Sequence, residues 1–97
     1  MKDKRTELEL SSYARENVCY SNLVVISHSP DEFVLDFAQC LPALDKPYIT
    51  DRIVMTPYHV SRFLGALIEN VQKYEKNFGV IDKEKNNDIW KGGENND

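Results

Sequence analysis

Residues 48–78 read YITDRIVMTPYHVSRFLGALIENVQKYEKNF, and this stretch decides the fold. Its first part is rich in β-branched and aromatic side chains, which favour a strand over residues 48–55. Thr56 and Pro57 then predict the start of a helix, because a threonine side chain caps free N–H groups and proline suits the first helical position. The stretch therefore predicts a strand followed directly by a long helix.

The helix predicted after Pro57 is amphipathic. Charged side chains such as Arg62, Glu69 and Lys73 share one side of it. The opposite side carries what we call the apolar stripe: Val60, Phe63, Leu64, Leu67, Ile68, Val71, Tyr74 and Phe78. Such a stripe is typical of a helix that packs against a core. We therefore expect it to be buried, with Leu67 and Ile68 at its centre.

Two further strands precede this stretch and predict a β-hairpin. Residues 22–28 (NLVVISH) and 32–39 (EFVLDFAQ) both have strand composition. Between them Pro30 and Asp31 suit the central positions of a type I turn. Residues 6–10 alternate polar and apolar side chains and predict a fourth strand, whereas residues 11–20 fit either a loop or a bulged continuation of the sheet.

Alternation along the strands assigns side chains to the two faces of this sheet. The strand at 22–28 is apolar on both faces, with Leu23 and Val25 on one and Val24 and Ile26 on the other. Asp36 opposes the apolar row of its own strand. The other predicted rows are Phe33, Leu35 and Phe37 on the second strand, and Ile49, Ile53 and Met55 on the third.

The predicted fold class is α+β: an antiparallel meander of three to four strands followed by one long amphipathic helix. Gly79 predicts the end of this helix, and Val80 is expected to fold back on Tyr74 as in a Schellman ending. We expect a disordered N-terminus over 1–5 and one domain over 6–81. Residues 82–97 are polar apart from an Ile-Trp pair and predict a flexible tail.

Length and charge restrict the classes of function. The chain has 97 residues and a formal charge of −4, with 12 Lys and Arg against 16 Asp and Glu. An acidic protein repels nucleic acid on average, so we expect no sequence-specific nucleic-acid binding. No stretch resembles a signal peptide or a membrane span, which predicts a cytoplasmic protein that does not enter membranes. A domain of this size buries only about 60–65% of its surface, so a partner subunit would help it.

Few residues suggest chemistry. The histidines His28 and His59 and the cysteines Cys19 and Cys40 are a formally possible zinc set, but no two have the short spacing that preorganises a metal site. Ser27 and His28 with Asp36 resemble parts of a hydrolytic triad, yet neighbouring side chains on a strand point to opposite faces. We expect no catalytic residue, no metal site and no cofactor, and two free thiols.

Protein interaction is the better prediction. A single helix covers only one face of the sheet, so the other face leaves an apolar patch for a second copy or another partner. Arg52 and Arg62 are candidates for a basic spot. Ile89 and Trp90 would anchor a partner or pack on their own domain, since tryptophan is enriched at interfaces. The candidate interaction residues are Val24, Ile26, His28, Arg52, Arg62, Ile89 and Trp90.

Two parts of the chain also resemble a known family. The first comprises Tyr20–Leu23, Ile26–Pro30, Glu32-Phe33 and Asp36-Phe37. The second comprises Arg52–Pro57, His59, Arg62, Leu64, Ala66-Leu67, Glu69-Asn70 and Lys73–Glu75. Over about residues 8–79 the chain resembles domain of unknown function 3467, a small bacterial and archaeal family.

The resemblance implies a role beside the transcription machinery, because genes of such proteins often neighbour those of the large RNA polymerase subunits. It therefore implies a non-enzymatic accessory protein that binds RNA polymerase through protein surface. The alternatives are a self-associating structural or regulatory homodimer and, less favoured, a small enzyme or metal-binding protein.

Overall fold

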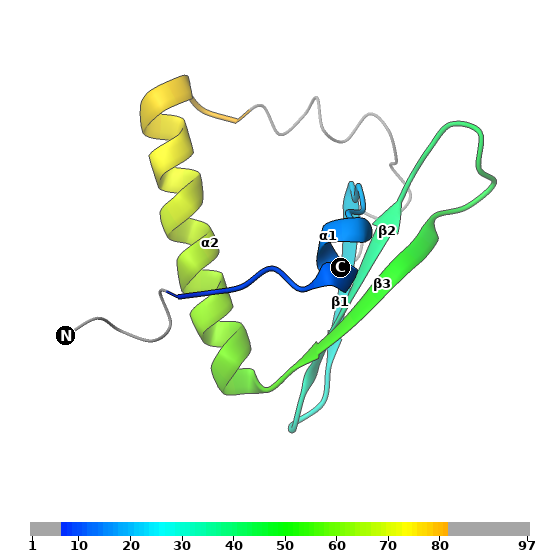
Figure 1. Ribbon diagram of the computed structural model, residues 1–97, viewed down its shortest axis with the longest axis horizontal. Helices are drawn as coiled ribbons and strands as arrows, with labels where there is room; N and C mark the ends of the chain where they lie inside the picture. Colours follow the sequence, from blue (N-terminus) through cyan, green and yellow to red (C-terminus); the bar gives the residue numbers. More distant parts are fainter. Residues whose placement is uncertain (1–6, 82–97) are drawn as a thin grey trace.

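The computed structural model describes residues 7–81 and contains one sheet and two helices. A short helix, α1 (Ser12–Glu16), precedes three strands: β1 (Leu23–His28), β2 (Phe33–Gln39) and β3 (Tyr48–Met55). A long helix, α2 (Pro57–Phe78), follows them (Figure 1). The predicted α+β class is therefore confirmed.

The strands form an antiparallel meander in the order β1-β2-β3. The hairpin turn is closed by the backbone N–H of Ser29, which donates to the carbonyl of Glu32 at 2.9 Å. Asn22 fixes the other end of β1, because its side chain accepts a hydrogen bond from the N–H of Cys40 and donates one to the carbonyl of the same residue. The meander is thus pinned at both ends of β1.

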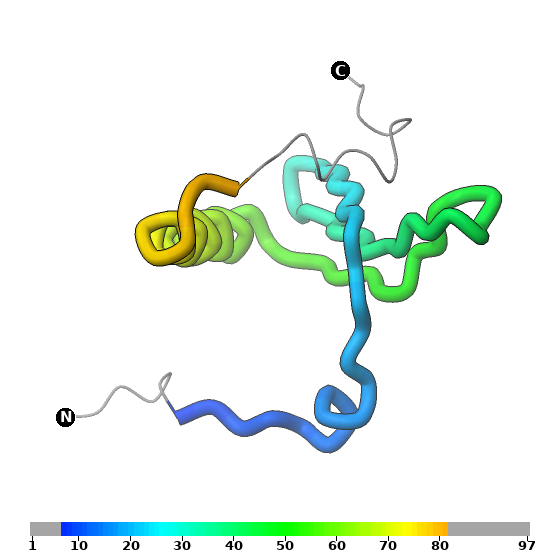
Figure 2. The backbone as a smooth tube through the Cα atoms, turned by 90° about the horizontal axis from the view of Figure 1, so that it is seen from above, coloured from blue at the N-terminus to red at the C-terminus, as the bar shows by residue number. Residues whose placement is uncertain are grey.

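The predicted fourth strand is not confirmed. Residues 7–11 have no regular secondary structure, and the sheet of the described chain has three strands. Residues 11–20, predicted as loop or bulged sheet, instead contain α1, which Ser11 caps by accepting a hydrogen bond from the N–H of Ala14. Figure 2 shows this N-terminal segment running away from the sheet. An alternating pattern forms a strand only where a neighbouring strand edge is available for pairing.

The register assigns the two faces of the sheet. The helix-side face, named for the helix that begins beside it, carries Val24, Ile26, His28, Phe33, Leu35, Phe37, Asp51, Ile53 and Met55. The far face carries Leu23, Val25, Ser27, Val34, Asp36, Ala38, Ile49, Arg52 and Val54. The predicted alternation is confirmed on β1 and β2.

One predicted face assignment on β3 is wrong. Ile49 pairs with Ala38 on the far face and does not share a face with Ile53 and Met55. The cause is a β-bulge, where the partners on β3 step from Asp51 to Ile49 and leave Thr50 without one. An extra residue in one strand moves every side chain beyond it to the opposite face.

The bounds of α2 are as predicted. Thr56 caps the helix by accepting a hydrogen bond from the N–H of His59, and Pro57 is the first helical residue. Gly79 follows the last helical residue with a φ of 97°, a conformation that glycine adopts without strain. The predicted Schellman ending is wrong, because the N–H of Gly79 bonds the carbonyl of Glu75 and Val80 is 86% exposed.

The predicted core is also wrong within a single chain. None of the residues of α2 is buried, and the buried apolar side chains of residues 7–81 are Leu35, Ala38 and Cys40, all on or next to β2. The reason is geometric: only Thr56 separates β3 from α2, so the helix leaves along the direction set at the end of the strand and diverges from the sheet (Figure 1). Within residues 7–81, no surface consequently covers its stripe.

The predicted disordered residues 1–5 and flexible tail 82–97 lie outside the described residues. No helix in the described part of the chain combines the length and the apolarity that crossing a membrane requires.

Candidate interaction surface

An apolar groove lies between the helix-side face and the first turns of α2. Its volume is about 490 Å³. Ser61 supplies its one polar side chain. The lining residues are Ile26, Phe33 and Leu35 from the sheet, and Pro57, Val60, Ser61, Phe63, Leu64 and Leu67 from the helix. A groove with this lining is suited to apolar side chains and offers almost no polar group to orient a small polar substrate.

The apolar stripe is continuous with this groove and extends beyond it. The groove ends at Leu67, whereas the stripe runs on to Phe78. Its large side chains Phe63, Leu64, Leu67, Ile68, Tyr74 and Phe78 are 39% to 73% exposed. Tyr74 and Phe78 contact each other with ring centroids 5.0 Å apart and cover little of one another's surface. The stripe is therefore an open apolar surface along the whole helix.

Three of the predicted interaction residues lie on the helix-side face. Val24 and Ile26 are exposed, and Ile26 lines the groove. His28 lies at the hairpin end of β1, where its ring stacks on Phe33 at a centroid distance of 5.3 Å. The structure thus brings these three residues to one surface, next to α2.

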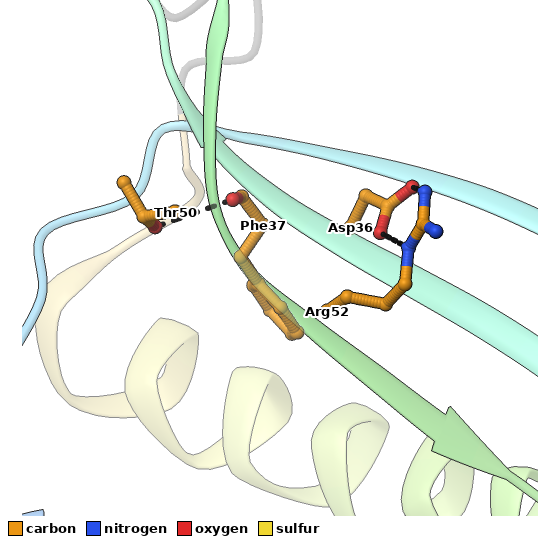
Figure 3. A network of polar contacts seen from close by, with 4 residues as sticks. All are labelled: Asp36, Phe37, Thr50 and Arg52. Carbon is orange, nitrogen blue, oxygen red and sulfur yellow. Dashed lines mark hydrogen bonds and ion pairs between the residues drawn. The ribbon is translucent and has the colours of Figure 1, made fainter.

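Arg52 lies on the far face and forms an ion pair with Asp36, directly opposite on β2 (Figure 3). Its Nε donates to Oδ1 of Asp36 at 2.6 Å and its Nη2 to Oδ2 at 2.9 Å. Such a two-point contact matches the planar guanidinium to the carboxylate. Asp36 is 8% exposed, so the guanidinium supplies the partner that a carboxylate in this position needs.

Arg62 belongs to a different environment. It lies on α2, and its guanidinium carbon is 5.8 Å from the centre of the Tyr58 ring. Arg52 is occupied by Asp36 on the sheet. The two arginines therefore have separate partners on separate elements, and the structure does not join them into one basic spot.

In the described chain, the histidines, cysteines and the Ser27–His28–Asp36 set do not come together as a metal site or a triad, although Cys19 and Asp51 line one small pocket with Asn17 and Ser21. Cys19 is exposed and Cys40 is buried, both as free thiols, and a hydrogen bond with Asp51 raises the pKa of the Cys19 thiol. Ser27 and Asp36 lie on the far face, opposite to His28. Among residues 7–81 no three His, Cys, Asp or Glu side chains are placed to hold a metal ion. Ile89 and Trp90 lie outside the described residues.

From the Asp36–Arg52 ion pair we predict how the melting temperature depends on pH. The hydrogen bond from Arg52 lowers the pKa of Asp36 below its ordinary value of 3.8, against a smaller opposing effect of burial. Its stabilisation is therefore complete above that ordinary value and is lost as the pH falls through the lowered pKa of the folded state. We expect Arg52→Gln to melt at a lower temperature than the wild type near pH 7. The difference between the two melting temperatures should become smaller towards pH 2, because Asp36 is then protonated in the wild type.

Arg62→Gln is the matched control, because it removes the same charge from a residue that forms no ion pair within residues 7–81. Its melting temperature should follow the wild-type curve at every pH. The same pH-dependent gap for both variants would contradict the assignment of the effect to the Asp36–Arg52 pair.

Two features of this surface were missed by the sequence reasoning. The exposure of the stripe has no local signal, because periodicity shows that a helix face needs covering and not what covers it. The Asp36–Arg52 pair does have a signal in the sequence. Opposite charges on the same face of adjacent strands often pair once the register is known.

Comparison with known proteins assigns the family. No curated protein and no solved structure matches the chain. The family described as "Protein of unknown function (DUF3467)" matches residues 2–83, most of the chain and all of its described sheet and helices. The chain belongs to this family.

Proposed function

We propose that the protein is a non-enzymatic protein-interaction module. The observation that carries this proposal is the exposure of the apolar stripe on α2. A large exposed side chain offers about 150–250 Å², so the stripe presents on the order of 500–600 Å² of apolar surface. The largest such patch on a typical monomer is about 300–600 Å² and is often functional, and here the helix-side face adds to it.

The most specific form of the proposal is a cytoplasmic accessory protein of bacterial RNA polymerase. Its support is the implication carried by the family resemblance, together with a surface suited to binding protein. The formal charge of −4 favours contact with polymerase subunits over contact with DNA phosphates.

The test is binding to purified RNA polymerase core enzyme from the source organism. Immobilised full-length protein should retain the core enzyme in the absence of DNA. Retention should persist after nuclease treatment, because the proposed contact is between protein surfaces. Absence of retention across micromolar concentrations would contradict the polymerase role and would leave the interaction class to other partners.

Trp90 offers a sharper prediction for that contact. Truncation of a tryptophan anchor often costs 2 kcal/mol or more, so we expect Trp90→Ala to weaken polymerase binding by about thirtyfold or more. The neighbouring change Lys91→Ala is the control and should have little effect on the affinity. Both variants should melt as the wild type does. A large drop in the melting temperature of Trp90→Ala alone would show that Trp90 packs on its own domain.

A homodimer without a polymerase role is the second candidate function. It is favoured by the same stripe, because one chain carries both an apolar groove and an apolar helix surface able to fill it. The remaining alternative, a small enzyme or metal protein, is tested by elemental analysis of the purified protein. A stoichiometric metal would support that alternative.

A further inference from the structure

We propose that a second copy of this chain covers the apolar groove, in a two-fold dimer where the stripe of each α2 packs into the groove of the other copy. This inference rests on the proposed function as an interaction module and names the occupant of its apolar surface. RNA polymerase would then contact surfaces outside the groove, including the segment around Trp90.

The groove and the stripe are complementary in chemistry. Ile26 and Leu35 from the sheet and Leu64 and Leu67 from the helix line the groove, and no charged side chain does. The helix presents the same kind of side chain along its length. A copy of α2 entering the groove would therefore exchange water for apolar contact on both partners.

The second half of α2 is not covered by any other part of residues 7–81. A helix of 22 residues is about 33 Å long, and the groove accounts for its part up to Leu67. Beyond it Ile68, Tyr74 and Phe78 remain 47%, 50% and 73% exposed, where the helix diverges from the sheet (Figure 1). A two-fold partner supplies apolar surface here, because each copy contributes its own helix and sheet.

Charge does not oppose this arrangement at the interface. Arg62, Glu69 and Lys73 lie on the side of α2 opposite to the stripe, by the helical spacing of the sequence. Packing stripe into groove therefore keeps these three charges in water. Glu75 lies on the side of the stripe by the same spacing, but near the end of α2, where its carboxylate accepts a hydrogen bond from the N–H of Ile81 at 3.3 Å and stays at the edge of the interface. The formal charge of −4 on each copy acts at longer range and is screened by salt.

The small core of the single chain favours a second copy of the chain, and not a different protein, as the occupant of the groove. Within residues 7–81 the buried apolar side chains are Leu35, Ala38 and Cys40, which is too small a core to hold a domain of this size. A cover is then needed whenever the chain is folded, and a second copy is always present where the chain is made. Obligate homodimers behave in this way and have no stable folded monomer.

The area is also sufficient. A standard interface buries about 800 Å² on each partner. The stripe supplies on the order of 500–600 Å² of this. Val24, Ile26 and Ile53 on the helix-side face are each at least 41% exposed and extend the same surface. In a two-fold dimer every such contact occurs twice, so the loss of one side chain acts at two symmetric places.

Light scattering coupled to size-exclusion chromatography tests the proposal on the full chain. We expect a mass of two chains, twice 11.2 kDa, over the whole concentration range in which circular dichroism shows folded protein. The melting temperature should rise by about 3–6 °C for each tenfold increase in protein concentration, because a dimer is stabilised by mass action. A folded species of one chain, or of any number other than two, would overturn the proposal.

A matched pair of variants locates the interface. Leu64 and Leu44 are 55% and 41% exposed in the single chain, and Leu44 lies in the connection between β2 and β3. We expect Leu64→Ala to raise the dimer dissociation constant at least a hundredfold and Leu44→Ala to change it less than threefold. Equal effects of the two changes would overturn the assigned surface. Because these measurements use the purified chain alone, a failure of polymerase binding does not affect them.

Discussion

Leu67→Asp is expected to abolish the cooperative unfolding transition of the protein. Leu67 lies at the centre of the apolar stripe and lines the groove, yet it is 48% exposed in the single chain. A charge on a half-exposed surface keeps its hydration and would cost little. A charge buried in a dimer interface with no partner costs several kcal/mol, and the two-fold axis introduces it twice. Far-ultraviolet circular dichroism with thermal melting measures the outcome.

Ala66→Asp is the control for this change. It introduces the same residue one position away, on the side of α2 opposite to the stripe. Asp costs about 0.5–0.7 kcal/mol relative to Ala in a helix interior, so a small decrease in melting temperature is expected. Comparable melting curves for Leu67→Asp and Ala66→Asp would show that the stripe stays exposed to water in the folded protein.

Leu35→Ala is expected to lower the free energy of unfolding by about 2–5 kcal/mol, the usual cost of truncating a buried leucine. Leu35 is 2% exposed, the lowest value among the large apolar side chains of the described residues. It lies on the middle strand, between Ile26 of β1 and Ile53 of β3 in the register. Removing its side chain leaves a cavity that two flanking strands prevent from collapsing. Denaturation by urea gives the free energy.

The control for Leu35→Ala is Leu41→Ala, the same truncation at a residue that is 42% exposed in the connection after β2. It should cost less than about 1 kcal/mol. If Leu35→Ala were no more destabilising than Leu41→Ala, the middle strand would not be the centre of the core.

The sequence predicted those parts of the fold that depend on local signals. The bounds of β3 and α2 follow from side chains next to each other in the chain, above all Thr56, Pro57 and Gly79. The hairpin follows from two strand-forming runs on either side of Pro30 and Asp31. In each case the residues that determine the structure are also the residues that form it.

The remaining parts depend on contacts between distant residues. The bulge that moves Ile49 to the far face is set by pairing with β2, where the hydroxyl of Thr50 donates to the carbonyl of Phe37 at 3.3 Å (Figure 3). A helix of five residues such as α1 is too short to show a period. The sequence also predicted that the apolar stripe is buried. Its periodicity does not show whether the stripe packs against the same chain or against a second chain.

For the candidate surface, the sequence reasoning assigned Val24 and Ile26, or Leu23 and Val25, to the sheet face that α2 would leave uncovered. Val24 and Ile26 are exposed, but they lie on the face next to α2, and their interaction role stays a prediction. The sequence reasoning assumed that α2 would cover one sheet face and that the other face would bind a partner. In the structure α2 covers the sheet only in part and its own stripe is exposed. The candidate surface therefore comprises the helix as well as the sheet. The predicted roles of Ile89 and Trp90 stay predictions.

Isotope-filtered nuclear Overhauser spectroscopy tests the central claim most directly. Equal amounts of ¹³C-labelled and unlabelled full chain would be unfolded together and refolded, so that half of the dimers contain one chain of each kind. We predict cross-peaks between methyl groups of the stripe, such as those of Leu67 and Val71, on one chain and those of Ile26, which is 56% exposed in the single chain, on the other. A folded sample in which these methyl groups give contacts only within one chain would contradict the account.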